Sequence, residues 1–143
     1  MPTPHRTPGR RRSTRSLSPR GTSGFSSASQ LFPLSHAYDA ERVLQNQMGL
    51  NALWPTEWLC QEMVLRPGMR VLDRGCGKAL SSIFLAREYG VQAWATDLGI
   101  PATDNLRRIG EAGLSDRVLP IHADTRCLPY GEAFFDATVC VDA

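Results

Sequence analysis

Hydrophobic and polar positions from residue 69 onward alternate between two kinds of segment. Short, mostly apolar runs at 69–75, 91–97, 117–124 and 134–143 predict buried strands. The intervening segments 80–90 and 103–113 read as helices that stop at a glycine. No hairpin signal lies between the strands, so the connections are crossovers and the strands run parallel. We therefore predict an α/β fold, a doubly wound Rossmann-like sheet with four predicted strands and its ligand beyond their carboxyl ends.

Two helices are predicted ahead of this sheet, within a segment at 37–66. The first has Asp39 near its start and Gly49 at its stop. The second begins after Thr56, which has the residue type of an N-cap. Trp54 and Trp58 are four positions apart and share a helical face if this helix extends that far. We expect that face to pack on the core; a wall of a substrate pocket is the alternative.

Residues 1–36 hold six arginines, no acidic residue and no periodic apolar pattern. Such a segment buries too little to offset its ordering entropy, which predicts a disordered tail. A transit peptide has similar composition, but the amphipathic helix that it needs is opposed by Pro2, Pro4, Pro8 and Pro19. An RNA-binding tail would use the same arginines, but its only aromatic stacking partners would be Phe25 and Phe32. A start codon assigned too far upstream would also give such a tail. The predicted organisation is thus a tail at 1–36, helices at 37–66 and a partial α/β domain at 67–143.

The net charge and the spacing of the cysteines limit the kinds of ligand that the chain is expected to bind. Residues 37–143 carry 10 basic residues against all 14 acidic ones, so the predicted folded part does not favour nucleic acid. No apolar run approaches the roughly 20 residues of a membrane span. The four cysteines form no CxxC pair or Cys/His cluster, so no metal site is predicted. With no signal peptide, a cytoplasmic setting is expected.

The turn after the first strand reads Asp73-Arg74-Gly75-Cys76-Gly77. Its glycines let the backbone approach a ligand closely. A carboxylate at Asp73 would repel the pyrophosphate of a dinucleotide and attract a cationic group. The third glycine of GxGxxG is also missing, because Leu80 occupies its place. Both features favour S-adenosylmethionine, which carries an ammonium group, over NAD.

Residues 71–142 resemble the first half of a class I S-adenosylmethionine-dependent methyltransferase domain. The match runs through VLDRGCGKALS, WATD, HAD and FFDATVCVD, in the family's order and spacing. The resemblance implies that Asp73 and the turn formed by Gly75, Cys76 and Gly77 hold the methionine end. It also implies that Asp97 binds the ribose hydroxyls. Asp124 and the backbone of Ala123 would lie at the adenine, and Asp142 at the mouth where methyl transfer occurs.

The positions of Asp97 and Asp124 in the chain can be compared with the roles that the resemblance implies for them. Asp97 comes 22 residues after Gly75, enough for one helix and one strand to return to the same sheet edge. A carboxylate can accept both hydroxyls of a ribose. Helix capping is the alternative for Asp97, although Pro101 and Thr103 supply a separate helix start. An Asx turn is the alternative for Asp124.

Two residues depart from the family's pattern. Ala79 stands where the family usually has a third glycine, and we expect alanine to be tolerated if the backbone there is helical. Arg74 replaces an apolar residue, so it needs solvent or a carboxylate partner. Cys76 and His122 could act as nucleophile and general base, but packing and loop roles are expected instead.

The resulting hypothesis is methyl transfer to a small-molecule acceptor, with no catalytic side chain assigned. Alignment of acceptor, methyl and sulfur can carry much of such a reaction. Because the chain stops at the tip of the fourth strand, we expect a fragment. A non-catalytic nucleoside-binding domain and an NAD-binding Rossmann domain are the alternatives. The pattern predicts neither the acceptor nor the oligomeric state.

Overall fold

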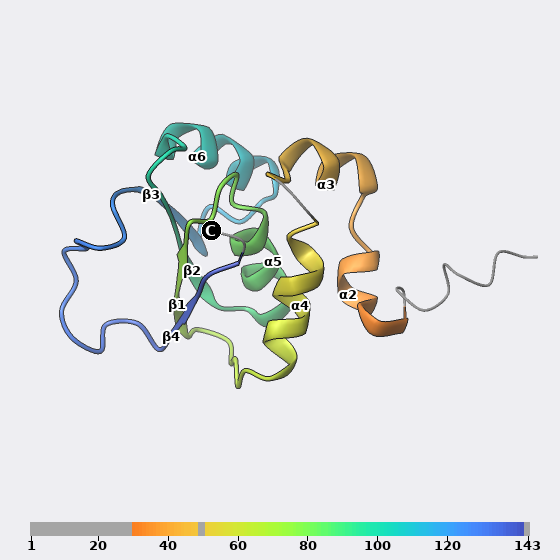
Figure 1. Cartoon of the computed structure of the whole chain (residues 1–143), viewed down its shortest axis with the longest axis horizontal. Coiled ribbons are helices and arrows are strands. Elements are labelled where there is room, and N and C mark those ends of the chain that lie inside the picture. Colours follow the sequence, from red (N-terminus) through yellow and green to blue (C-terminus); the bar gives the residue numbers. More distant parts are fainter. Residues whose placement is uncertain (1–29, 49–50, 142–143) are drawn as a thin grey trace, which may run out of the picture.

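The computed structural model describes residues 30–48 and 51–141. Its centre is a four-stranded sheet of β1 (Arg70–Arg74), β2 (Gln92–Asp97), β3 (Val118–His122) and β4 (Ala137–Val139) (Figure 1). The strand order is β3-β2-β1-β4, and every neighbouring pair is parallel. The predicted parallel α/β sheet is confirmed.

The order of strands reverses between β1 and β4. The chain moves outward from β1 to β2 and β3 through α5 (Leu80–Tyr89) and α6 (Ala102–Glu111), then returns to the other side of β1. Because crossovers are right-handed, a reversal of direction moves the connection to the opposite face. Figure 1 shows this arrangement, with the helices on one side of the sheet and the connection 123–136 on the other. A reversal of this kind is where open α/β sheets bind ligands.

The core lies between the sheet and α5. Phe84, Leu85 and Val71 have no exposed surface, and Val91 and Val139 are equally enclosed. Helix α5 is apolar on most sides because it packs on β2 and also against α4 (Leu53–Gln61). It ends at Gly90, whose φ of 68° is a left-handed conformation that glycine adopts without steric cost. The predicted stop at this glycine is confirmed.

The helical segment before the sheet agrees with the prediction only in part. Helix α3 (Ala40–Asn46) begins after Asp39, whose side chain accepts a hydrogen bond from the Arg42 amide at 2.8 Å. The predicted stop at Gly49 lies outside the described residues. Thr56 is not an N-cap, so that prediction is wrong.

Helix α4 begins one turn earlier than predicted, at Leu53. Pro55 is tolerated there because amides in the first turn need no partner within the helix. The Asn51 side chain accepts from the Leu53 amide at 3.0 Å, and the Thr56 hydroxyl donates to the Ala52 carbonyl at 2.6 Å. Thr56 is therefore a buried residue inside the helix.

A short helix, α2 (Pro33–His36), falls within the segment predicted as a tail. The carboxylate of Glu57, which is 2% exposed, accepts from the Leu34 amide at 3.0 Å and from the amide and hydroxyl of Ser35. Helix α4 thus satisfies the free amides of α2 and draws residues 33–36 onto the fold. Residues 1–29 of the predicted tail lie outside the described residues.

The two tryptophans of α4 do not pack in the core, contrary to expectation. Trp54 is 43% exposed and Trp58 is 62% exposed. Trp54 stacks on Phe32 with ring centroids 5.9 Å apart. Among the described residues, no helix is long and apolar enough to cross a bilayer.

Candidate functional site

The predicted glycine turn folds back against the end of β2. Gly75 and Gly77 have φ angles of 66° and 53°. The amides of Gly75 and Cys76 both donate to the Thr96 carbonyl, at 2.9 and 3.1 Å. The Gly77 amide donates to Asp97 Oδ2 at 2.8 Å. Left-handed backbone at both glycines makes this tight turn possible.

Asp97 anchors that turn as well as facing the cleft. Its Oδ1 accepts from the amides of Gly99 and Ile100 at 2.7 and 3.0 Å. A carboxylate offers about four acceptor positions, so three hydrogen bonds leave one open, on Oδ2. The alternative capping role is not the one observed, because the N-cap of α6 is Pro101.

Two cavities flank the turn at the carboxyl ends of the strands. One, of about 200 Å³, lies toward α3 and α4 and is lined by residues that include Gly75, Cys76, Gly77, Ser81 and Asp97. The other, of about 280 Å³, is lined by Arg74, Gly75, Asp97, Leu98, Asp124, Thr125 and Cys140. Gly75 and Asp97 line both, so the cavities form the two arms of one cleft at the strand reversal.

Asp73 lies directly behind this cleft and is only 1% exposed. Its Oδ2 accepts hydrogen bonds from the hydroxyls of Ser81 and Ser82, both at 2.6 Å. Its Oδ1 is buried and has no partner among the described residues. Burial raises the pKa of Asp73 to about 6, the serine hydroxyls oppose this rise, and the charge of Asp97 adds to it.

Ser81 and Ser82 are functional candidates that the sequence analysis missed. They follow Asp73 by eight and nine positions and lie in the first turn of α5. Ser81 lines the first cavity, whereas Asp73 lines neither. The Ser81 hydroxyl therefore connects the buried carboxylate with the cleft. Two adjacent serines at the start of this helix were the available signal.

A second missed residue supports the turn from α6. The side chain of Asn105, 1% exposed, donates to the Gly77 carbonyl at 2.9 Å. Its carbonyl oxygen accepts from Arg108 at 3.0 Å. Asn105 thus fixes the far side of the turn that Asp97 holds from the near side.

Asp124 lines the second cavity but is engaged locally. Arg126 donates to its carboxylate through both the backbone amide, at 2.9 Å, and the guanidinium, with a closest approach of 2.5 Å. These hydrogen bonds lower the pKa of Asp124 to about 2. The Asx-type turn considered as the alternative is therefore present. The Ala123 amide donates to the Asp97 carbonyl at 3.1 Å. Asp142 lies outside the described residues.

The two departures from the family's pattern have different outcomes. Arg74 reaches solvent, and its guanidinium approaches the Thr125 hydroxyl at 3.4 Å on the rim of the second cavity. Ala79 was expected to be tolerated if the backbone there is helical, and this condition is not met. It is fully buried with φ 62° and ψ 19°, a left-handed conformation before α5 that costs roughly 1–2 kcal/mol for a residue with a Cβ.

Cys76 packs in the core, and His122 contacts a backbone carbonyl group. Burial raises the pKa of the Cys76 thiol, which keeps it protonated within an apolar cluster. His122 Nε2 lies 2.8 Å from the Leu98 carbonyl oxygen. Among the described residues, no group of three or more His, Cys, Asp or Glu side chains is arranged to hold a metal ion.

Comparison with known proteins finds a similar sequence and similar solved structures. Methyltransferase GfsG from Streptomyces halstedii is 32% identical over 89 residues, covering 62% of this chain and 32% of the relative. The structure of the [4+2]-cyclase SpnF is 27% identical, with a TM-score of 0.56 and coverage of 65% of this chain and 36% of that one. A methyltransferase from Thiobacillus denitrificans in complex with S-adenosyl-L-homocysteine is 24% identical, with a TM-score of 0.54 and coverage of 80% and 44%.

The chain spans about a third of the length of the curated relative that it matches. Residues 71–143 match a family described as a methyltransferase domain. That match begins at β1 and includes the glycine turn, Asp97 and Asp124. The likeness to solved methyltransferase structures agrees with the partial Rossmann-like sheet. The chain belongs to the class I S-adenosylmethionine-dependent methyltransferase family.

Proposed function

We propose that the cleft binds S-adenosylmethionine and serves methyl transfer to a small-molecule acceptor. The observation that carries this proposal is the unpartnered Oδ1 of Asp73, a buried acceptor beside the glycine turn. A buried polar atom without a partner is costly unless a ligand supplies one. An ammonium group offers both donors and the opposite charge.

The residues of the cleft fit the other parts of the cofactor in order. We assign the methionine end to the cavity lined by Gly75, Gly77 and Ser81, with Asp73 behind it. The open acceptor position of Asp97 suits one ribose hydroxyl. The second cavity, with Asp124 on its wall, suits the adenine.

The cofactor supplies an activated methyl group on its sulfonium. The protein's own contribution is to hold that group in a fixed orientation through the anchored turn, which can account for much of the rate. No described side chain is assigned as a general base. Because the four cysteines are free among the described residues, the proposal retains a reducing, cytoplasmic setting.

A domain that binds the cofactor without transferring methyl is the second candidate. The similarity to a [4+2]-cyclase favours it, because that name describes a different reaction. The NAD alternative is not favoured, because Leu80 occupies the third glycine position and the Asp73 carboxylate lies behind the turn, where it would repel a pyrophosphate.

Calorimetry with two ligands tests the proposal. S-adenosylhomocysteine has the amino acid group, and 5′-methylthioadenosine lacks it. We expect Asp73→Asn to weaken S-adenosylhomocysteine about tenfold or more and to leave methylthioadenosine unchanged. We expect Asp97→Asn to weaken both. Asp116→Asn, a change at an exposed residue paired with Arg117, is the matched control.

Equal affinity of the Asp73→Asn variant and the parent chain for S-adenosylhomocysteine would contradict the assignment. Tighter binding of NAD than of either adenosyl ligand would contradict the cofactor. Transfer of a labelled methyl group from S-adenosylmethionine to an acceptor separates the enzyme from the non-catalytic binding domain.

A further inference from the structure

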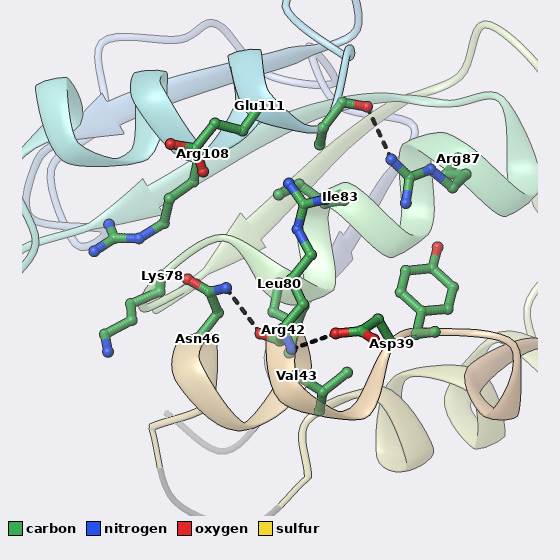
Figure 2. A pocket seen from close by; sticks show the side chains of 12 residues that line it. Asp39, Arg42, Val43, Asn46, Lys78, Leu80, Ile83, Arg87, Arg108 and Glu111 are labelled. Atoms are coloured by element: carbon green, nitrogen blue, oxygen red, sulfur yellow. Dashed lines mark hydrogen bonds between the residues drawn. The ribbon is translucent and has the colours of Figure 1, made fainter.

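A separate pocket lies on the helical side of the molecule, between α3, α5 and α6 (Figure 2). Its volume is about 30 Å³. Val43, Leu80 and Ile83 supply apolar surface. Four cationic side chains from three helices and the glycine turn also line it: Arg42, Lys78, Arg87 and Arg108. Figure 2 shows Arg42 extending from α3 toward Ile83 of α5.

The hydrogen bonds of these cations are to neutral groups. Lys78 Nζ donates to the Gln45 carbonyl at 2.9 Å, and Arg87 Nη2 donates to the Ala112 carbonyl at 2.8 Å. Arg108 Nη1 donates to the Asn105 side chain at 3.0 Å. Among the described residues, no carboxylate oxygen lies within 4.0 Å of the side-chain nitrogen atoms of the four cations. Their charges are therefore not neutralised by ion pairs.

The two acidic side chains of the pocket are already engaged elsewhere. Asp39 caps α3 by accepting from the Arg42 amide at 2.8 Å. Glu111 pairs with Arg107 at 2.7 Å on the exposed face of α6. The balance within the pocket remains positive, and like charges around a small cleft repel one another unless an anion or water separates them.

We propose that this pocket binds one oxyanion, the phosphate or carboxylate group of a small molecule. Guanidinium groups match the geometry of such groups and form strong charge-assisted hydrogen bonds. A volume of about 30 Å³ exceeds the 10–15 Å³ that one water needs, so it admits a single compact group. Residues 37–143 carry a net negative charge, so the cluster is a local basic site and not part of a surface for nucleic acid.

The pocket adjoins the proposed cofactor cleft, but Asp97 of that cleft does not line it. Asn46, Lys78 and Leu80 line both this pocket and the cavity of about 200 Å³. Lys78 also follows Gly77 directly in the chain. An anion held here would therefore lie beside the glycine turn, and a competition experiment must distinguish it from a group of the cofactor itself.

A titration of the isotopically labelled chain with inorganic phosphate, at constant ionic strength set by sodium chloride, tests the proposal by NMR. We expect saturable shifts at the guanidinium signals of the pocket arginines and at the Lys78 amide. Arg42→Gln and Arg108→Gln should each weaken phosphate about tenfold. Glu111→Gln should strengthen it, because the pocket loses a negative charge. A parallel titration with acetate separates a carboxylate preference from a phosphate preference.

Arg117→Gln is the matched control, because Arg117 is exposed, pairs with Asp116 and lies outside the pocket. It removes the same charge and should leave phosphate affinity unchanged. The proposal is overturned if neither anion gives saturable shifts, or if Arg117→Gln weakens phosphate as much as Arg42→Gln. Displacement of phosphate by S-adenosylhomocysteine would also overturn it, because the pocket would then belong to the cofactor cleft.

Discussion

The protonation state of Asp73 sets how binding in the cleft depends on pH. Burial raises the pKa of this carboxyl group from 3.8 to about 6 in the protein without ligand. An ammonium group favours the ionised carboxylate, so binding lowers the pKa again. The affinity for S-adenosylhomocysteine therefore increases as the pH rises through about 6 and levels off at about pH 7, below the pH at which the ligand's ammonium group begins to lose its proton.

The size of the effect follows from the pKa. At about pH 5, roughly one Asp73 in ten is ionised, so the affinity is about tenfold lower than at about pH 7. The amino group of the ligand stays protonated across this range, since α-amino groups titrate near 7.7–8.0. Asp73 is thus the group that changes charge.

The same pKa predicts the direction of a stability change. The folded chain holds the Asp73 proton more tightly than the unfolded chain, so the associated stability is fully present below pH 3.8 and is lost as the pH rises through about 6. The loss is about 3 kcal/mol across that window. Chemical denaturation at a series of pH values measures it, and Asp73→Asn should abolish this part of the slope.

Calorimetry between about pH 5 and pH 7 is the binding assay. S-adenosylhomocysteine should show the tenfold change together with proton release near the pKa. Methylthioadenosine should show neither, because it lacks the ammonium group. A flat profile for S-adenosylhomocysteine would refute this reasoning, as would an equal slope for methylthioadenosine or a slope that survives in Asp73→Asn.

Three further changes probe the site and its support. Ser82→Ala removes one hydroxyl that lowers the Asp73 pKa, so the midpoint of the pH profile of S-adenosylhomocysteine binding should move to higher pH. Calorimetry measures this midpoint, and an unchanged midpoint would contradict the role of the hydrogen bond. Gly77→Ala should destabilise the chain by roughly 1–2 kcal/mol, the cost of a left-handed alanine, because its Cβ would lie 3.1 Å from the sulfur of Met48, an exposed side chain that can shift. Gly113→Ala, with φ 71° and open space around it, should show the same backbone cost. A much larger loss for Gly77→Ala in urea denaturation would show that the turn cannot accommodate a Cβ. Glu57→Gln should lower the free energy of unfolding by about 1–3 kcal/mol, and an unchanged thermal midpoint would show that α2 is held in another way.

The sheet and its two crossover helices were predictable because their signals are local. Apolar runs buried on both faces identify β1 and β2, and Gly90 and Gly113 mark where α5 and α6 end. The strand reversal beside β1 then follows from the family resemblance. The start of α4 was not predictable from a capping pattern, because the Asn51 side chain and the position of Pro55 override the signal at Thr56.

The sequence predicted the acidic residues and the glycines of the candidate site, but it did not predict the side chains that form hydrogen bonds with them. Nothing near Asp73 in the sequence shows that Ser81 and Ser82 share one of its oxygens. That contact depends on how α5 packs against β1, a tertiary feature. The left-handed backbone of Ala79 is likewise set by the approach of the turn to α5 and cannot be deduced from residue type.

The most direct test of the central claim is to map S-adenosylhomocysteine onto the chain by NMR titration. Saturable amide shifts are expected at Gly75–Gly77, at Ser81 and Ser82, and at 97–100 around Asp97, with methylthioadenosine sparing the two serines. These are the residues that line the cleft or hold its carboxylates. No saturable shift at the glycine turn, or shifts centred away from the carboxyl ends of the strands, would contradict the account.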